Sequence, residues 1–200
     1  MNAPTSLDQR PHFLAETHAV ENVSRELADY NLFTEDRALR DAVQREGAAW
    51  AEADLRAFGA RVGAADYLQL GFDANRYPPE FDTHDRFGNR VDLVSYHPAY
   101  HTLMDTALSH GPKTGAHVAR AAHSYLHGQV EAGHGCPITM TFACIPSIRT
   151  TPAIATLWEP KITACEYDPR NLPDRDKQSV TIGMGMTEKQ GGSDVRSNTT

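Results

Sequence analysis

The segment from residue 179 to residue 197 constrains this chain most, because an apolar stretch runs directly into a loop rich in glycine and hydroxyl groups. The β-branched residues within 179–184 are typical of a strand. Gly191 and Gly192 let the backbone approach a ligand without obstruction by a Cβ atom. Free N–H groups in such a loop can cradle a pyrophosphate. An ordinary Gly-Gly turn before Ser193 is the alternative that spacing alone leaves open.

From Gly185 the chain reads Gly-Met-Thr-Glu-Lys-Gln-Gly-Gly-Ser-Asp, so a small residue, an apolar residue and Thr-Glu precede Gly-Ser-Asp. This pattern resembles the first signature of the acyl-CoA dehydrogenase flavoproteins. Most of those dehydrogenases have a proline after the glutamate, whereas Lys189-Gln190 here is similar to the AidB-like branch of the family. Five further blocks resemble that branch in order and rough spacing, so that the resemblance covers about residues 30 to 200: Asn31-Leu-Phe, Arg45-Glu-Gly, His97-Pro-Ala-Tyr-His, Gln129-Val-Glu-Ala-Gly and Cys136-Pro-Ile-Thr-Met-Thr-Phe-Ala.

The resemblance implies FAD as the cofactor and assigns roles to individual residues. Thr187 matches the position that bonds the flavin ring, and Ser193 matches the position that contacts the FAD pyrophosphate. Met140 and Thr141 match a helix under the substrate cavity, although a threonine that bonds back to its own helix is the alternative. The general base of relatives lies in a C-terminal bundle, so the catalytic base is expected beyond Thr200. The implied FAD-binding residues are Met184, Gly185, Met186, Thr187, Glu188, Lys189, Gln190, Gly191, Gly192 and Ser193.

The same resemblance implies a mainly α fold, an acyl-CoA dehydrogenase-like N-terminal helical domain followed by the first strand and the FAD loop of the middle β domain. We predict the helical domain over residues 1–165, with an extended arm over 1–30. Residues 166–200 are predicted to be a connector and the start of a truncated β domain. The parent protein is then expected to be a longer homotetramer, in which DNA contacts belong to a basic C-terminal region that this chain lacks.

Apolar periodicity predicts the helices of the first domain. The pattern favours one long helix over residues 35–58, and the nearly all-apolar residues 138–148 favour a buried helix. Residues 80–96 indicate an irregular excursion or a small hairpin, because Phe-Gly-Asn lies between short mixed segments. The remaining helices are predicted at 64–75, 98–108 and 116–132.

Composition excludes several classes of protein. The formal net charge is −7, from 26 acidic and 19 basic residues, so we do not expect this segment to bind nucleic acid by itself. No apolar run reaches the roughly 18 residues of a membrane helix, and the polar first residues lack the apolar block of a signal peptide, so we expect no membrane association and a cytoplasmic location. The three cysteines lack Cys-x-x-Cys spacing, which predicts reduced and mostly buried thiols.

Two histidine pairs have helical i, i+4 spacing, namely His97 with His101 and His123 with His127. Neither pair has the glutamate of a His-Glu-x-x-His motif or an obvious third ligand, so we predict no metal site.

Two functions stay open for the parent protein. One is an AidB-like flavoprotein of the DNA alkylation response, which Lys189-Gln190 favours. The other is an acyl-CoA dehydrogenase that oxidises acyl-CoA thioesters by hydride transfer to FAD. The 200-residue chain alone is predicted to be inactive, and an inactive helical scaffold is a third possibility.

Overall fold

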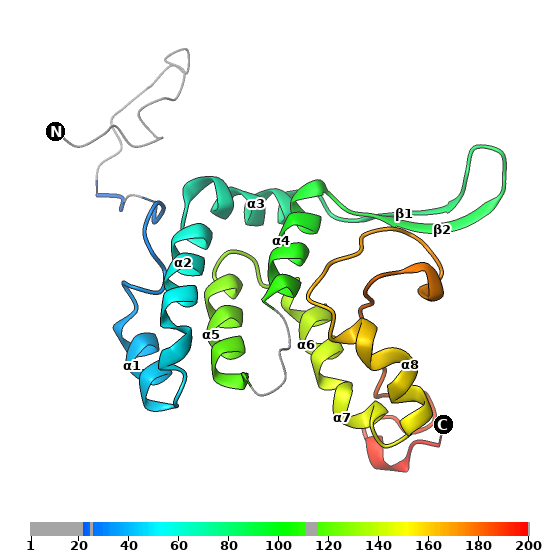
Figure 1. Cartoon of the computed structure of the whole chain (residues 1–200). Coiled ribbons are helices and arrows are strands. Elements are labelled where there is room, and N and C mark those ends of the chain that lie inside the picture. The colour runs from blue at the N-terminus through cyan, green and yellow to red at the C-terminus, as the bar shows by residue number, and fades with distance from the viewer. Residues whose placement is uncertain (1–21, 25, 111–115, 200) are drawn as a thin grey trace.

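The computed structural model describes residues 22–24, 26–110 and 116–199, which form a mainly α structure with one small sheet (Figure 1). Most of the predicted arm over 1–30 therefore lies outside the described residues. The helices are α1 (Arg37–Arg45), α2 (Glu52–Val62), α3 (Ala65–Arg76), α4 (Pro98–Ser109), α5 (His117–Gly128), α6 (Gly135–Ala143), α7 (Ile145–Ile148) and α8 (Pro152–Ile162). The strands are β1 (Glu80–His84) and β2 (Arg90–Ser95), and short 3₁₀ turns are η2 (Ala49–Ala51), η3 (Asp174–Asp176) and η4 (Val195–Ser197).

The first predicted helix is wrong as a single element, because the chain divides it into α1, η2 and α2. Gly47 adopts φ 79°, a left-handed conformation that ends the helix and that glycine adopts at little cost. Asp36 begins α1, since its carboxylate accepts the N–H of Leu39 at 2.8 Å.

Helices α1 to α5 share one apolar core, in which Leu55, Leu103 and Leu126 are completely buried. The segment before α1 closes this core through Phe33, which is also completely buried. Its backbone packs tightly against the end of α2, because a Cβ atom on Gly63 would lie 1.8 Å from the carbonyl oxygen of Tyr30. These contacts fix the helices that carry the polar clusters described below.

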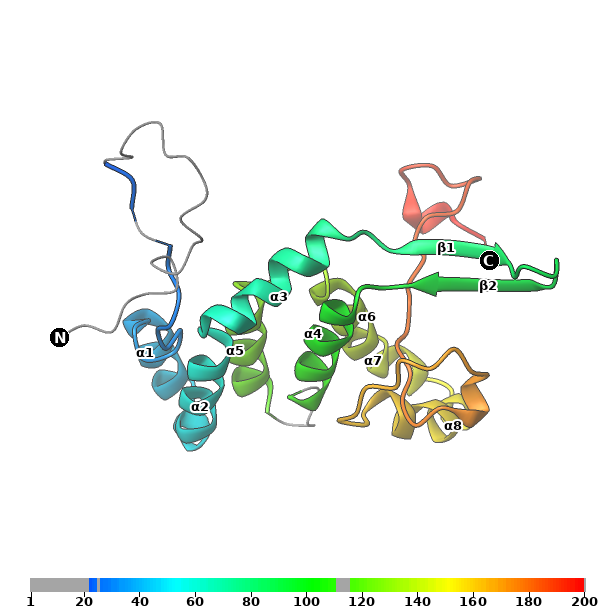
Figure 2. The ribbon, with the colours of Figure 1, turned by 90° about the horizontal axis from the view of Figure 1, so that it is seen from above.

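Strands β1 and β2 form an antiparallel hairpin that extends away from the helical body (Figures 1 and 2). Glu80 pairs with Ser95 and Phe81 with Val94, and Gly88 turns the chain with φ 82°. The structure therefore forms the hairpin rather than the irregular excursion. Its base leads directly into α4, so it places Tyr96 beside the start of that helix.

The region after α5 corrects two further predictions. Residues 138–148 form α6 and α7 rather than one buried helix, and only Thr141 and Ile145 are fully buried among them. Residues 179–184 are extended but form no strand, because no neighbouring strand pairs with them among the residues described.

The predicted burial of the thiols is also wrong in most cases, because Cys136 and Cys165 are exposed and only Cys144 is partly covered. Within the described part of the chain, no helix combines the length and the apolar character needed to cross a membrane. The predicted boundary near residue 165 stays a prediction, although α8 is the last α-helix of the described chain.

Candidate functional site

The predicted FAD segment lies on the surface next to the last described residues. Met184 and Met186 are 57% and 58% exposed, and the amide of Asn198 donates to the carbonyl oxygen of Met186 at 2.9 Å. Gln190 closes the loop from its other end, since Nε2 donates to the carbonyl oxygen of Thr199 at 2.7 Å. The segment is thus folded back on its own C-terminal neighbours and leaves one side open.

Gly192 is required by the geometry of this loop, whereas Gly191 packs against the end of a side chain. A Cβ atom on Gly191 would lie 1.5 Å from Oδ1 of Asn198, and Gly192 has φ 54°. Among the described residues the exposed hydroxyl groups of Thr187 and Ser193 make no hydrogen bond, and the buried Oδ1 of Asn198 has no donor. Partnerless polar groups around a tightly turned backbone fit a polar ligand such as the flavin nucleotide.

The predicted cavity residue Thr141 connects α6 to the start of this segment. Its hydroxyl donates to the carbonyl oxygen of Pro137 at 2.7 Å and accepts the N–H of Ile182 at 3.0 Å. The bond back to its own helix is therefore present together with a long-range bond. Met140 is half-buried on the same helix.

An aromatic cleft lies between the base of the hairpin, α4 and the connector, and sequence reasoning missed it. Its volume is about 300 Å³, and Tyr96, Tyr100 and Tyr167 lie along its wall. The rings of Tyr96 and Tyr100 stack with their centroids 4.1 Å apart. Thr181, just before the predicted FAD segment, also lines the cleft. A second cleft of about 400 Å³ shares the stacked pair of tyrosines.

A histidine and a tyrosine form the polar contact of the first cleft. Nδ1 of His101 lies 2.8 Å from the hydroxyl oxygen of Tyr167. Burial and the neighbouring Tyr100 and Tyr96 raise the pKa of Tyr167 to about 12, and burial lowers the pKa of His101. Both groups are therefore neutral near pH 7 and share one hydrogen bond.

The two histidines of the i, i+4 pair at the start of α4, His97 and His101, bind different partners. His97 caps α4, since Nδ1 accepts the N–H of Ala99 at 3.2 Å, and its ring stacks on Tyr77. The block His97-Pro-Ala-Tyr-His101 could have indicated the cleft from the sequence. Tyr167 lies far from this block in sequence, and no motif marks it as part of the cleft.

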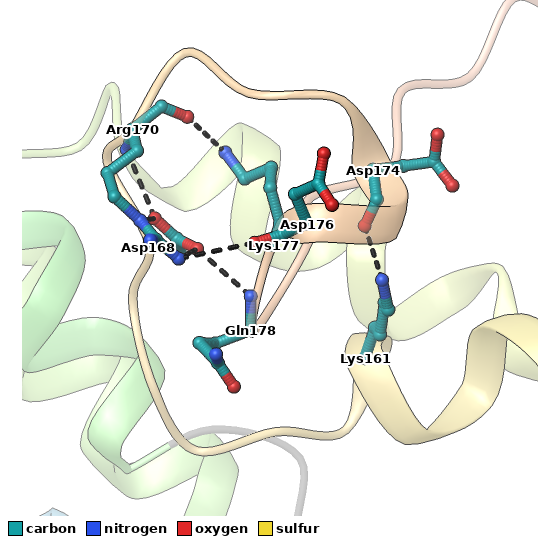
Figure 3. Close-up of polar contacts among 7 residues, drawn as sticks. All are labelled: Lys161, Asp168, Arg170, Asp174, Asp176, Lys177 and Gln178. Carbon is teal, nitrogen blue, oxygen red and sulfur yellow. Dashed lines mark hydrogen bonds and ion pairs between the residues drawn. The ribbon is translucent and has the colours of Figure 1, made fainter.

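A buried carboxylate fixes the connector that forms the other wall (Figure 3). Arg170 donates to both oxygens of Asp168 at 2.8 and 2.7 Å, and the backbone N–H of Gln178 donates to the same carboxylate at 2.9 Å. These bonds, with that from Arg170 first, hold the pKa of Asp168 well below its usual range. Lys177 donates to the carbonyl oxygen of Arg170, and Lys161 of α8 donates to that of Asp174. Residues 168–178 are therefore a braced loop.

Comparison with known proteins places this architecture in a family. The model of the adaptive response protein AidB N-terminal domain matches residues 22–169. The chain belongs to this family. It is 46% identical over 195 residues to the putative acyl-CoA dehydrogenase AidB of Escherichia coli (strain K12), covering 92% of this chain and 36% of that protein. It is 26% identical over 171 residues to acyl-CoA dehydrogenase family member 11 of Caenorhabditis elegans, covering 80% of this chain and 27% of that protein.

Solved structures show the same fold. The chain superposes on the apo form of Bd2924 with a TM-score of 0.67 at 23% identity, over 88% of this chain and 36% of that one. It superposes on Caenorhabditis elegans ACDH-11 in complex with C11-CoA with a TM-score of 0.65 at 21% identity, over 94% of this chain and 33% of that one. The chain thus spans about a third of the length of the relatives it matches. The acyl-CoA dehydrogenase-like fold and the AidB-like branch are confirmed, and the individual site residues stay predictions.

Proposed function

We propose that this chain is the N-terminal part of an AidB-like flavoprotein that binds FAD and acts in the DNA alkylation response. The family match supports the branch, and the link to alkylation rests on the name of that branch. The observation that carries the cofactor assignment is the loop of residues 187–193, in which the exposed hydroxyl groups of Thr187 and Ser193 have no hydrogen-bond partner among the described residues and Gly192 turns the chain with φ 54°.

Residues 184–193 would hold the cofactor in this proposal. Thr187 and Ser193 have hydroxyl groups free of partners among the described residues, so they are available to the flavin ring and to the pyrophosphate, respectively. Met140 and Thr141 would line the substrate cavity. The bound flavin would supply hydride acceptance, and the protein would orient it and exclude water. The assembly is proposed to be a cytoplasmic homotetramer whose DNA contacts lie in a C-terminal region.

The second candidate is an acyl-CoA dehydrogenase, favoured by the names of the relatives and by the aromatic cleft of about 300 Å³ beside Thr181. Such an enzyme removes hydrogens from Cα and Cβ of a thioester and needs a positioned base. That base is proposed to lie beyond Thr200, so the 200-residue chain would not turn over acyl-CoA.

The cofactor assignment is tested on the full-length protein purified with FAD present. Thr187→Val combined with Ser193→Ala should lower flavin affinity at least about tenfold, because each change removes a donor that the ligand would otherwise use. Flavin absorbance after gel filtration measures retention. Thr156→Val and Ser147→Ala are matched controls, since Thr156 bonds only within α8 and Ser147 lies on the exposed side of α7. Equal flavin content in the paired variant and in wild type would refute the assignment.

Dye reduction by the same flavin-loaded protein separates the two functions. The AidB-like reading predicts at most weak reduction with straight-chain acyl-CoAs or isovaleryl-CoA. Robust substrate-dependent turnover would instead establish the dehydrogenase.

A further inference from the structure

Three polar side chains from α2, α4 and α5 lie close together in the N-terminal domain. Asp54 of α2, His110 at the end of α4 and His123 of α5 each place one ligand atom within 4.8 Å of the others. The rings of the two histidines face each other, with centroids 4.7 Å apart. Two imidazoles that bind one ion at about 2.1 Å through Nε2 have centroids roughly 5 Å apart, so this separation matches a shared ligand.

Both rings have a backbone carbonyl oxygen within hydrogen-bond distance of Nδ1. Nδ1 of His123 lies 2.8 Å from the carbonyl oxygen of Ala119, and Nδ1 of His110 lies 3.0 Å from that of Thr106. A carbonyl oxygen only accepts, so Nδ1 of His123 carries the proton and its Nε2 is left with a lone pair. Nδ1 of His110 also lies 3.1 Å from the hydroxyl oxygen of Ser109, and this ring has the same tautomer when its Nδ1 donates to Thr106. Metal-binding histidines have this arrangement, in which the second nitrogen donates to a backbone carbonyl.

The lone pair of His123 is buried and faces another acceptor. Its side chain is 9% exposed, and Nε2 has no hydrogen-bond partner, although Oδ2 of Asp54 lies 3.0 Å away. A carboxylate oxygen and an unprotonated nitrogen repel each other unless a positive species lies beside both. Either a proton or a metal ion satisfies the pair, and a metal ion would also use His110 as a ligand.

A cavity of about 50 Å³ touches all three side chains. That volume has room for an ion and water molecules that complete its coordination. Arg120 also lines the cavity, with its guanidinium carbon 3.8 Å from the ring centroid of Phe142, so its charge is partly engaged by that ring.

We propose that Asp54, His110 and His123 bind one divalent transition-metal ion, with Zn²⁺ preferred, and that the ion ties α2, α4 and α5 together. Two imidazole nitrogens and one carboxylate oxygen suit zinc, which commonly has three protein ligands and a water molecule. The neighbouring histidines are engaged elsewhere: Nε2 of His127 lies 2.9 Å from the hydroxyl oxygen of Tyr67, and Nδ1 of His134 lies 2.9 Å from Glu131.

The experiment uses the full-length protein, purified without a histidine tag and stripped with EDTA. Titration with Zn²⁺, and with Co²⁺ as a spectroscopic probe, should show one ion per chain and a visible d–d absorption. Asp54→Asn should weaken binding by at least tenfold, because loss of a direct ligand costs no less than the 10–100-fold typical of outer groups. Asp54 is exposed, so this change leaves the fold intact.

The controls remove equivalent groups elsewhere on the surface. Asp73→Asn changes a partly buried carboxylate of α3, and His84→Gln changes an exposed histidine of the hairpin. Neither change should alter the titration. His110→Gln and His123→Gln should each abolish the cobalt spectrum while far-UV circular dichroism stays that of wild type. The proposal would be overturned if the wild type bound no metal ion, or if Asp54→Asn and His110→Gln bound the ion as tightly as the wild type does. A proton between Asp54 and His123 would then explain their short distance.

Discussion

Asp168 shows how one carboxylate can determine the shape of a loop. Its carboxylate accepts from the side chain of Arg170 and from the backbone of Gln178, while its own side chain is only 5% exposed. Asp168→Asn should lower the melting temperature of the chain by about 2–5 °C, because the charged acceptor of several hydrogen bonds is lost. Differential scanning calorimetry measures the change. Asp174→Asn is the control, since Lys161 binds the backbone carbonyl of Asp174 rather than its carboxylate.

The sign of the pH dependence follows from the lowered pKa of Asp168. A group whose pKa is depressed by folding contributes stability above its unfolded pKa, and that contribution is lost as pH falls through the folded pKa. The difference in melting temperature between wild type and Asp168→Asn should therefore be constant from pH 5 to pH 8. It should shrink as the pH is lowered below the ordinary aspartate value of 3.8. A difference that grows on acidification would contradict the assignment.

At the residue scale, the sequence predicts features that depend on neighbours in the chain better than sites built from distant segments. Gly191 and Gly192 are predicted to permit a close backbone approach to a ligand, which stays a prediction, and Gly192 has a left-handed conformation that favours glycine. The proposed metal ligands could not be found in this way, because Asp54, His110 and His123 come from three helices. The i, i+4 spacing of the histidines gives no guide to such a site, because helical spacing contains no information about side chains on the neighbouring helices.

At the scale of elements, Thr141 is the connection between α6 and the extended segment that leads to the predicted FAD loop. Thr141→Val keeps the side-chain shape and removes the acceptor of the Ile182 N–H. Amide exchange at Ile182 should become about tenfold faster, as expected when a hydrogen bond of roughly 1–1.5 kcal/mol is lost. Hydrogen exchange measured by NMR tests this. Thr141→Ser retains the hydroxyl and should exchange like wild type, whereas equal rates in all three proteins would show that the bond does not hold the segment.

Helical periodicity predicted where most helices lie but not where they break. Gly47 and Cys144 interrupt apolar patterns that continue across them, so the pattern alone favoured one helix where the chain forms two. The extended residues 179–184 illustrate the opposite problem. Their composition favours a strand, but a strand needs a partner, and composition carries no information about one.

At the scale of the whole molecule, net charge limits what this chain binds. The formal charge of −7 repels duplex DNA, and the lysines and arginines of residues 170–177 are interleaved with acidic residues. In the braced loop Arg170 is already paired with Asp168. DNA contact in the proposed function is therefore assigned to another part of the protein.

The 200-residue chain should bind duplex DNA no more tightly than ordinary nonspecific proteins, with a Kd on the order of 10⁻⁴ M or weaker at physiological salt. Fluorescence anisotropy with a labelled duplex at about 50 mM and 200 mM salt measures this. A protein that neutralises 6–10 phosphates loses about 10³–10⁵ in affinity over that range, whereas this chain should show almost no salt dependence because it releases few counterions. Tight binding with a steep salt dependence would instead reveal a basic face formed by residues distant in sequence. The DNA-binding role would then have to be assigned to the N-terminal domain itself.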